Sequence, residues 1–426
     1  MSSRPTGIDL FAGAGGMSLG FEQAGFDIIA AVEIDPIHCA IHEYNFPSTT
    51  MICSDISKVS SNQLVNIALE KGKEQIDVIF GGAPCQGFSL IGKRALDDPR
   101  NSLVKEFVRI VSEVKPKYFV FENVKGLTVG KHKKVLAELI ESMEAAGYEV
   151  IKPVQVLNAA NYGVPQDRQR VFVIGALKSL PLPKYPEPEY DLDANKIEGH
   201  IKSTPTVSCA LMDLPNADDF DELEYSDSVK CSYGTPSDYV RRLNGLIPDK
   251  NNYGFKRSWD SELMTCSLRT EHGKESKKRF AKTEAGKTEP ISRFKKLDPK
   301  GVCNTLRAGT GSDKGAFTSP RPIHPVYARC ITVREAARLH SYPDWFRFHA
   351  TKWHGFRQIG NSVPPLLARA VATEVREALG VNVGKPRKTL KLGNQELLTI
   401  KMSGAADRFS VPSDVVGRRL RETANA

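Results

Sequence analysis

DLFAGAGGMSLGFEQAGF, residues 9–26, joins a short apolar run to a helix-like stretch through a turn that contains Gly13, Gly15 and Gly16. A strand that passes through such a turn into a helix presents the helix's N-terminal amide groups and dipole to an anionic ligand. The glycines do not follow the G-x-G-x-x-G spacing of the dinucleotide fingerprint. The stretch therefore predicts a strand–turn–helix unit with an anion-binding turn, but not a dinucleotide site.

The first 177 residues continue this alternation of strands and helices. Five runs rich in Val, Ile and Phe are expected to be strands: residues 8–12, 27–34, 77–82, 118–124 and 171–177. Helix-sized stretches lie between them, at 36–46, 102–115 and 132–147. This rhythm predicts an α/β fold with a doubly wound, mostly parallel sheet, in which ligands bind at the carboxyl ends of the strands.

The pattern changes near residue 178, where Pro-rich and mixed polar sequence begins, and helical signals return at 332–344 and 364–380. We therefore predict a catalytic domain of 1–177 and 326–380, interrupted by a smaller second domain of 178–325. Residues 381–426 form a C-terminal extension. In it, KTLKLGNQELLTIK (388–401) is predicted to be a hairpin around Gly393 and Asn394, and basic GRRLRE (417–422) belongs either to a solvated tail or to an accessory DNA contact.

Composition narrows the possible partners. The formal charge is +9 and the pI is about 9.0, which suits a polyanion. Residues 176–250 carry 8 Lys or Arg and 14 Asp or Glu, whereas 251–325 carry 16 and 8, so the basic excess is local. The eight cysteines are scattered without zinc spacing, and no apolar run is long enough to span a membrane. We expect a cytoplasmic protein with no metal and no membrane partner.

Two carboxylates follow predicted strands. Glu33 ends the second strand, where it could accept two ribose hydroxyls, and Asp55 follows a third. With the glycine-rich turn, this layout fits a nucleoside that carries an amino-acid-like anion better than a pyrophosphate. Either carboxylate alone could equally be a solvated strand end.

A cysteine stands in a tight loop after another strand. GGAPCQGFSL (81–90) presents Cys85 at the open edge of the sheet, whereas a structural cysteine is normally buried within an element. Glu122 ends the next strand, and QDRQR (166–170) supplies Arg168 and Arg170. A thiol, a carboxylate and a fixed positive charge at three strand ends can act as nucleophile, acid and anchor.

Six motifs together resemble the DNA cytosine methyltransferases that make 5-methylcytosine. They occur in the family's order: DLFAGAGGMSLGFEQAGF, GGAPCQGFS, ENV, QDRQRVFVIG, TVREAARLHSYPD and QIGNSVPP. The resemblance covers about 1–177 and 326–375, and it implies a Rossmann-like S-adenosylmethionine-dependent methyltransferase sheet. The middle segment lies where the family carries its target recognition domain. The chain as a whole resembles the stand-alone prokaryotic or phage modification enzymes of restriction-modification systems, so a restriction endonuclease acting on the same site is an expected partner.

The resemblance implies a mechanism. The Cys85 thiolate would add to carbon 6 of a cytosine flipped out of double-stranded DNA, so that carbon 5 can take the methyl group of S-adenosylmethionine. Glu122 would bind the ring's N3 and exocyclic amine. Arg168 would hold the cytosine O2, and Arg170 would support the site.

The resemblance also implies the cofactor contacts. Phe11 would stack on the adenine, Glu33 would bind the ribose, and Asp55 with Ile56 would meet the adenine edge. Further cofactor contacts are expected from Gly13, Gly15, Gly16, Ile34, Pro84, Asn361 and Val363. Expected DNA contacts are Gln86 and Ser89 in the loop after Cys85. From the charge split, we add Lys277, Lys278 and Arg279 as phosphate contacts and Arg307 as a base contact, with the acidic half of the second domain facing away from DNA.

Three other functions stay open. A branch of the same family methylates cytosine in tRNA, although its Cys-Phe-Thr tripeptide is absent from the target region here. A catalytically silent DNA-binding relative is disfavoured because Cys85, Glu122 and Arg168 are all present. A nucleotide-dependent oxidoreductase is disfavoured by the glycine spacing.

Overall fold

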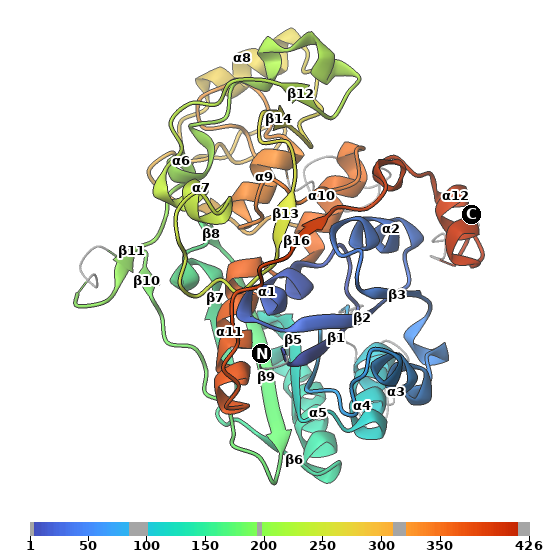
Figure 1. The fold of residues 1–426 in the computed structure, drawn as a ribbon. Coiled ribbons are helices and arrows are strands. Elements are labelled where there is room, and N and C mark those ends of the chain that lie inside the picture. The colour runs from blue at the N-terminus through green and yellow to red at the C-terminus, as the bar shows by residue number, and fades with distance from the viewer. Residues whose placement is uncertain (1–3, 85–100, 194–197, 310–320, 416–426) are drawn as a thin grey trace, which may run out of the picture.

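The computed structural model describes residues 4–84, 101–193, 198–309 and 321–415 (Figure 1). Its centre is an eight-stranded sheet of order β3-β2-β1-β4-β5-β9-β6, with β7 also paired to β9. The strands are β1 Thr6–Leu10, β2 Asp27–Glu33, β3 Thr50–Cys53, β4 Val78–Gly81, β5 Tyr118–Val124, β6 Tyr148–Val150, β7 Gln155–Asn158 and β9 Gln169–Leu177. The first five are parallel, and β9 runs antiparallel to β5. All five predicted strands are therefore present, in the predicted kind of sheet.

Helices cover both faces of the sheet. One face is covered by α3 Ser61–Glu70, α4 Ser102–Val114 and α5 Lys133–Ala145, and the other by α1 Gly16–Ala24 and α11 Pro365–Ala378. The packing of α11 on α1 is tight, because a Cβ on Gly20 would lie 2.4 Å from the Cβ of Ala368. The last helix of the predicted catalytic domain thus packs directly on its first.

The described residues of 178–325, here called the second region, lie largely above the sheet in Figure 1 and have little regular structure. Its strands are two to three residues long and its helices are short: β10 Tyr190–Asp191, β11 Lys202–Ser203, α6 Val207–Leu211, β12 Val229–Lys230, α7 Asp238–Leu243, β13 Lys256–Ser258, β14 Leu263–Met264, α8 Lys274–Lys282 and β15 Cys303–Asn304. One apolar core joins this region to α2 Pro36–Asn45, α9 Val333–Leu339 and α10 Lys352–Asn361. This core contains residues from both sides of position 326. The domain boundary that the sequence places there therefore stays a prediction.

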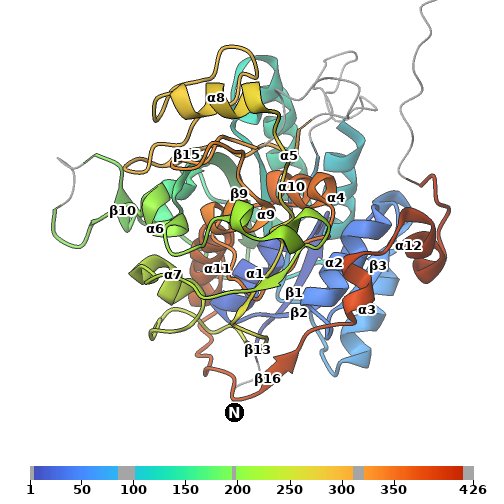
Figure 2. The ribbon, with the colours of Figure 1, turned by 90° about the horizontal axis from the view of Figure 1, so that it is seen from above.

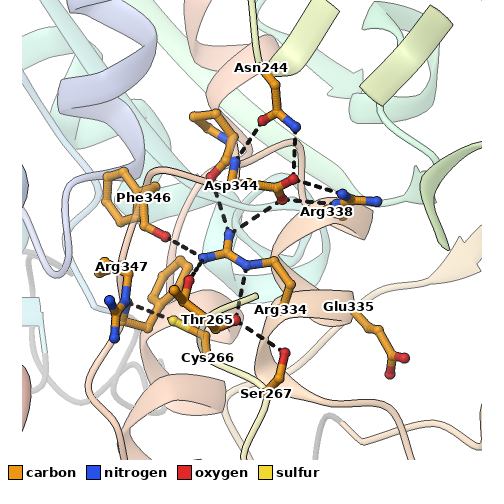
Figure 3. A network of polar contacts seen from close by, with 12 residues as sticks. Asn244, Thr265, Cys266, Ser267, Arg334, Glu335, Arg338, Asp344, Phe346 and Arg347 are labelled. Carbon is orange, nitrogen blue, oxygen red and sulfur yellow. Dashed lines mark hydrogen bonds and ion pairs between the residues drawn. The ribbon is translucent and has the colours of Figure 1, made fainter. Parts of the chain in front are cut away.

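Two buried arginines of α9 connect the parts of this core through hydrogen bonds and ion pairs (Figure 3). Arg338 binds both carboxylate oxygens of Asp344, at 2.9 and 2.7 Å, and Asp213 at 2.6 Å. Arg334 donates to the Thr265 hydroxyl and to the carbonyls of Thr265, Pro343 and Phe346. Two guanidinium groups buried to 1% exposure are thus surrounded by acceptors, as buried charges must be.

The C-terminal extension differs from its prediction. No hairpin forms within 388–401: β16 Thr389–Lys391 pairs in parallel with β13, and Gln395–Leu398 form a 3-10 helix followed by α12 Met402–Phe409. The Gly393 amide donates to the Tyr44 carbonyl at 2.8 Å, and the Asn394 side chain caps the 3-10 helix, so contacts with α2 replace the expected turn. GRRLRE (417–422) lies outside the described residues.

Candidate active site

The glycine-rich turn holds Glu33 at the carboxyl end of β2. The Gly13 amide donates to Glu33 Oε2 at 2.9 Å, and the amides of Ile34 and Asp35 donate to Oε1, both at 3.0 Å. Phe11 adopts a left-handed backbone with φ 63°, which is costly for a bulky residue and is found mainly where function requires it. The turn and the carboxylate therefore form one preorganised unit.

The neighbouring strand end adds a second carboxylate and an exposed apolar side chain near Glu33. Glu33 pairs in register with Cys53 of β3, so Asp55 follows two residues beyond, and its Oδ1 accepts from Ser57 N and Oγ, both at 2.9 Å. Ile34 is 37% exposed despite being apolar, whereas Ile56 is buried. Two carboxylates beside exposed apolar surface fit an adenosine group, whose hydroxyls and amine donate and whose ring is flat and apolar.

The QIGNSVPP segment lies against the turn. A Cβ on Gly16 would be 2.5 Å from the Val363 carbonyl oxygen and 2.7 Å from the Tyr342 hydroxyl, so only glycine allows this approach. Asn361, the last residue of α10, is exposed, whereas the Val363 side chain is buried in the core with Met17 and Phe21. A role for Val363 at the cofactor would thus be a backbone role.

The strand before the cysteine loop lies beside Glu122. Strands β4 and β5 are parallel neighbours, with Gly81 opposite Phe121, as expected from a doubly wound sheet. A Cβ on Gly82 would lie 2.4 Å from Glu122 Oε2, and Asn123 Nδ2 donates to the Ala83 carbonyl at 3.1 Å. Pro84 is exposed. Cys85, Gln86 and Ser89 lie outside the described residues.

Glu122 pairs with Arg170. Arg170 Nε is 2.9 Å from Glu122 Oε1, and Glu122 is 7% exposed. Burial raises the pKa of Glu122, while Arg170 and then Arg168 oppose that shift. Strand β9 begins beside the end of β5, with Arg170 opposite Val124, which brings the two side chains together. A buried carboxyl with a raised pKa is suited to donating as well as accepting a hydrogen bond.

Arg168 lies near this site, but its terminal nitrogens are used elsewhere. It is completely buried, and its guanidinium donates to the carbonyls of Leu306 at 2.7 Å, Gly360 at 2.9 Å and Ser362 at 2.8 Å. Because both of its terminal nitrogens donate to the backbone, the structure argues against Arg168 as the residue that holds the cytosine. Arg168 falls at the break between β8 Gln166–Asp167 and β9, and Arg170 takes the position beside Glu122.

Sequence reasoning missed the scaffold around Arg168. Gln166 accepts from Leu306 N and donates to the Leu339 carbonyl, and its Nε2 is 3.0 Å from His340 Nδ1. His340 Nε2 in turn contacts the Ser362 carbonyl at 3.1 Å. QDRQR therefore ties the catalytic strand to α9, α10 and the second region. Gln166 lies in the QDRQRVFVIG motif and Asn123 lies in the ENV motif. Their place in these motifs is the only sequence feature that could have indicated their roles.

The second region approaches the site through one strand. β15 pairs in parallel with β8, and residues 307–309 follow it. A Cβ on Gly360 would lie 2.2 Å from Ala308 N, so this loop packs against the end of α10. Arg307 is exposed there, in keeping with the base contact expected of it.

The basic residues of α8 are not alike. Lys277 and Lys278 are exposed, and Lys278 lies 3.0 Å from Glu275. Arg279 instead pairs with buried Glu289 at 3.2 Å. Arg279 keeps 33% of its side chain exposed in this pair, so the expected phosphate contacts of all three residues stay predictions.

The acidic half of the second region is not a separate face. Asp213 and Asp227 pair with Arg338 and Arg347 in the interior, and Glu224 pairs with Arg269 of the basic half. Several charges of residues 176–250 are thus neutralised inside the protein, and the expectation that this half faces away from DNA stays a prediction.

The structure is a doubly wound sheet with a carboxylate held by a glycine-rich turn at one strand end and a buried Glu–Arg pair at another. The family described as C-5 cytosine-specific DNA methylase matches residues 6–377. The chain belongs to that family, and it is a DNA (cytosine-5-)-methyltransferase. Within the described residues, no helix has the length and apolar character to cross a membrane.

Relatives support this assignment over nearly the whole chain. The Type II methyltransferase M.XorII of Xanthomonas oryzae pv. oryzae is 58% identical over 419 residues, which are 98% of this chain and 96% of the relative. M1.HphI of Haemophilus parahaemolyticus is 35% identical and covers 87% of this chain and 86% of its own. The structure of a putative DNA modification methyltransferase encoded within a prophage (E. coli) is 34% identical, with a TM-score of 0.70, and covers 88% of this chain and 100% of its own.

Proposed function

We propose that the protein transfers the methyl group of S-adenosylmethionine to carbon 5 of a cytosine flipped out of double-stranded DNA. The observation that carries this proposal is the Glu122–Arg170 pair at 2.9 Å, which stands beside the strand that leads to Cys85. The enzyme acts on DNA in the cytoplasm of a prokaryote. A restriction endonuclease that cuts the same site is its functional partner, as the Type II names of its relatives suggest.

The chain's own groups prepare the cytosine. Base flipping brings the ring out of the stack, at a cost of a few kcal/mol. Cys85 adds to carbon 6 as a thiolate, which makes carbon 5 electron-rich. Glu122 bonds to N3 and the exocyclic amine, and Arg170, rather than Arg168, donates to O2. Loss of the carbon 5 proton after transfer expels Cys85.

The cofactor would be held by residues of the glycine-rich turn and of the neighbouring strand ends. S-adenosylmethionine, when bound, supplies an electrophilic methyl group. Glu33, already fixed by three amides, holds the ribose hydroxyls. Phe11 and Ile34 flank the adenine, Asp55 and the backbone of Ile56 meet its polar edge, and the exposed Asn361 reaches the methionine end.

Trapping tests the covalent step. A duplex with 5-fluorocytosine at the target should give a denaturant-stable adduct only when S-adenosylmethionine is present, because fluorine cannot leave as the proton does. Cys85→Ser should lose methyl transfer by several orders of magnitude while its melting temperature is retained. A Cys85→Ser enzyme with near-normal turnover would contradict the mechanism.

Bisulfite sequencing tests the substrate. Host DNA after expression should contain 5-methylcytosine at one recurrent sequence, and that sequence defines the duplex used in the experiments below. If cytosines in host tRNA were converted to 5-methylcytosine while host DNA stayed unmethylated, the proposal would be wrong.

A further inference from the structure

A cavity of about 370 Å³ opens where α10 begins, outside the cofactor and cytosine sites. It lies between the second region and α10, lined among others by Leu268, Ala308, Arg321, Lys352, Trp353 and Phe356. Ala308 packs against Gly360, whose carbonyl binds Arg168. The cavity therefore lies next to the scaffold around Arg168.

The floor of the cavity is apolar and its rim is cationic. Trp353 is 51% exposed, a large aromatic surface left open to solvent. Arg357 stacks on its ring at 5.4 Å, and Arg321 lies 5.8 Å from the ring centre of Phe356. Lys352 Nζ donates to the Arg269 carbonyl at 2.7 Å. Aromatic faces interleaved with cations are the features that bind nucleotides outside a duplex stack.

The same positive field extends to α8. The pKa of His272 is lowered first by burial, Asp218 opposes the shift, and Arg321, Lys277 and Lys352 add to it. All three cations disfavour protonation of the same imidazole, so the rim of the cavity and the predicted phosphate contact Lys277 belong to one positively charged region. In Figure 2, α8 lies at the top of the view with α10 below it, whereas β13 lies near the bottom.

We propose that this cavity binds one nucleotide of the DNA that flanks the flipped cytosine, with its base or deoxyribose against Trp353 and its phosphate between Arg321 and Lys352. The proposal deepens the proposed function and rests on it. Arg321, Lys352 and Lys277 favour a polyanion as the occupant. The apolar floor favours a nucleotide over a bare phosphate, because a phosphate has no apolar surface to bury. Because the cavity adjoins the Arg168 scaffold, a nucleotide held there would help to keep the neighbouring base extruded.

The experiment compares matched variants on the duplex defined by bisulfite sequencing, with binding measured by fluorescence anisotropy. Trp353→Ala should weaken DNA binding about fivefold or more, the usual effect of losing one stacked base, and Trp353→Phe should restore most of it. Tyr225→Ala, which removes an aromatic side chain that is 79% exposed in the acidic half, is the control and should bind normally.

Charge variants test the rim separately. The double variant Arg321→Gln, Lys352→Gln should lower the slope of log affinity against log salt by about 0.9 for each DNA phosphate that the protein no longer neutralises. Lys256→Gln, at an exposed position on β13, should leave the slope unchanged. For both sets of variants, circular dichroism establishes that the fold is kept, and kcat at saturating DNA should change less than KM for DNA.

Two outcomes overturn the proposal in different ways. If wild-type enzyme methylates its site but Trp353→Ala binds as Tyr225→Ala does, the cavity does not bind DNA, and the proposed function stands. If the wild type forms no 5-methylcytosine in any DNA, the proposed function fails and the cavity proposal fails with it.

Discussion

Arg168 and Arg170 show how two identical side chains, two positions apart, take different tasks. Arg168 is buried among three carbonyls, whereas Arg170 lies against Glu122. An arginine without exposed donors cannot meet a substrate, but its loss leaves buried acceptors unsatisfied. We therefore expect the first arginine to support the architecture and the second to support the chemistry.

Substitution should separate these tasks. Arg170→Gln should lower kcat by about a hundredfold or more, since it removes a charged donor from the transition state, and should lower the melting temperature less than Arg168→Gln does, because glutamine keeps a donor toward Glu122. Arg168→Gln should instead cost about 3 kcal/mol or more of unfolding free energy, because a buried charged donor to several acceptors is lost. Thermal melts and single-turnover methylation measure the two effects. Equal losses of stability in both variants would contradict the division.

Glu33 gives a second prediction at this scale. Glu33→Ala should weaken S-adenosylmethionine binding by about 1.5–3 kcal/mol, the range for a charged hydrogen bond, as measured by calorimetry. Glu33→Gln keeps the shape and one acceptor, and it should lose less. Because Glu33 also accepts the Gly13 amide, an unchanged affinity in Glu33→Ala would assign this carboxylate to holding the turn alone.

At the scale of elements, α9 depends on ion pairs that titrate. Burial would raise the pKa of Asp344, but Arg338 and then Arg334 lower it to about 2. A carboxyl whose folded pKa lies below its unfolded value contributes stability above the unfolded pKa and loses it as the pH falls through the folded one. The contribution of Asp344 is thus full above about pH 4 and disappears toward pH 2.

Asp344→Asn should therefore destabilise the protein by about 3–5 kcal/mol at pH 7, the cost of breaking a buried pair. The difference from wild type should shrink between pH 4 and pH 2 in urea unfolding monitored by fluorescence. Asp238→Asn, whose carboxylate is exposed on α7, is the control. A difference that stays constant with pH would show that Asp344 acts through shape and not through charge.

At the scale of the whole molecule, the extension after residue 384 is part of the core. Leu397 and Leu398 are each 3% exposed, and β16 adds a strand to β13. Removing residues 385–426 should cost about 3–6 kcal/mol from these two leucines alone, at about 1.5–3 kcal/mol each, and lower the melting temperature by several degrees. Removing only 416–426 is the control. A shortened chain as stable as wild type would make the extension a solvated tail.

The sequence was informative wherever periodicity and short-range spacing decide the structure. The strands, the helices that cover them and the nearness of Glu122 to Gly82 at the end of β4 follow from local pattern and sheet topology. The difference between Arg168 and Arg170 could not be predicted, because it depends on a break between β8 and β9 and on carbonyls about 140 to 190 residues away. The hairpin failed for a related reason: Gly393 is a turn signal locally, yet a contact with Tyr44 determines its place.

The contact of Gly20 with Ala368 bears on how the protein is made. The helix that begins at Gly16 leaves the ribosome early, whereas the helix that covers it begins at Pro365. Synthesis proceeds at about 5–20 residues per second, so the first helix waits on the order of tens of seconds for its partner. During that interval its apolar face has no native cover, which favours chaperone binding. The nascent chain should therefore be unable to bind its cofactor fully, and methylation should begin only after translation has passed residue 378.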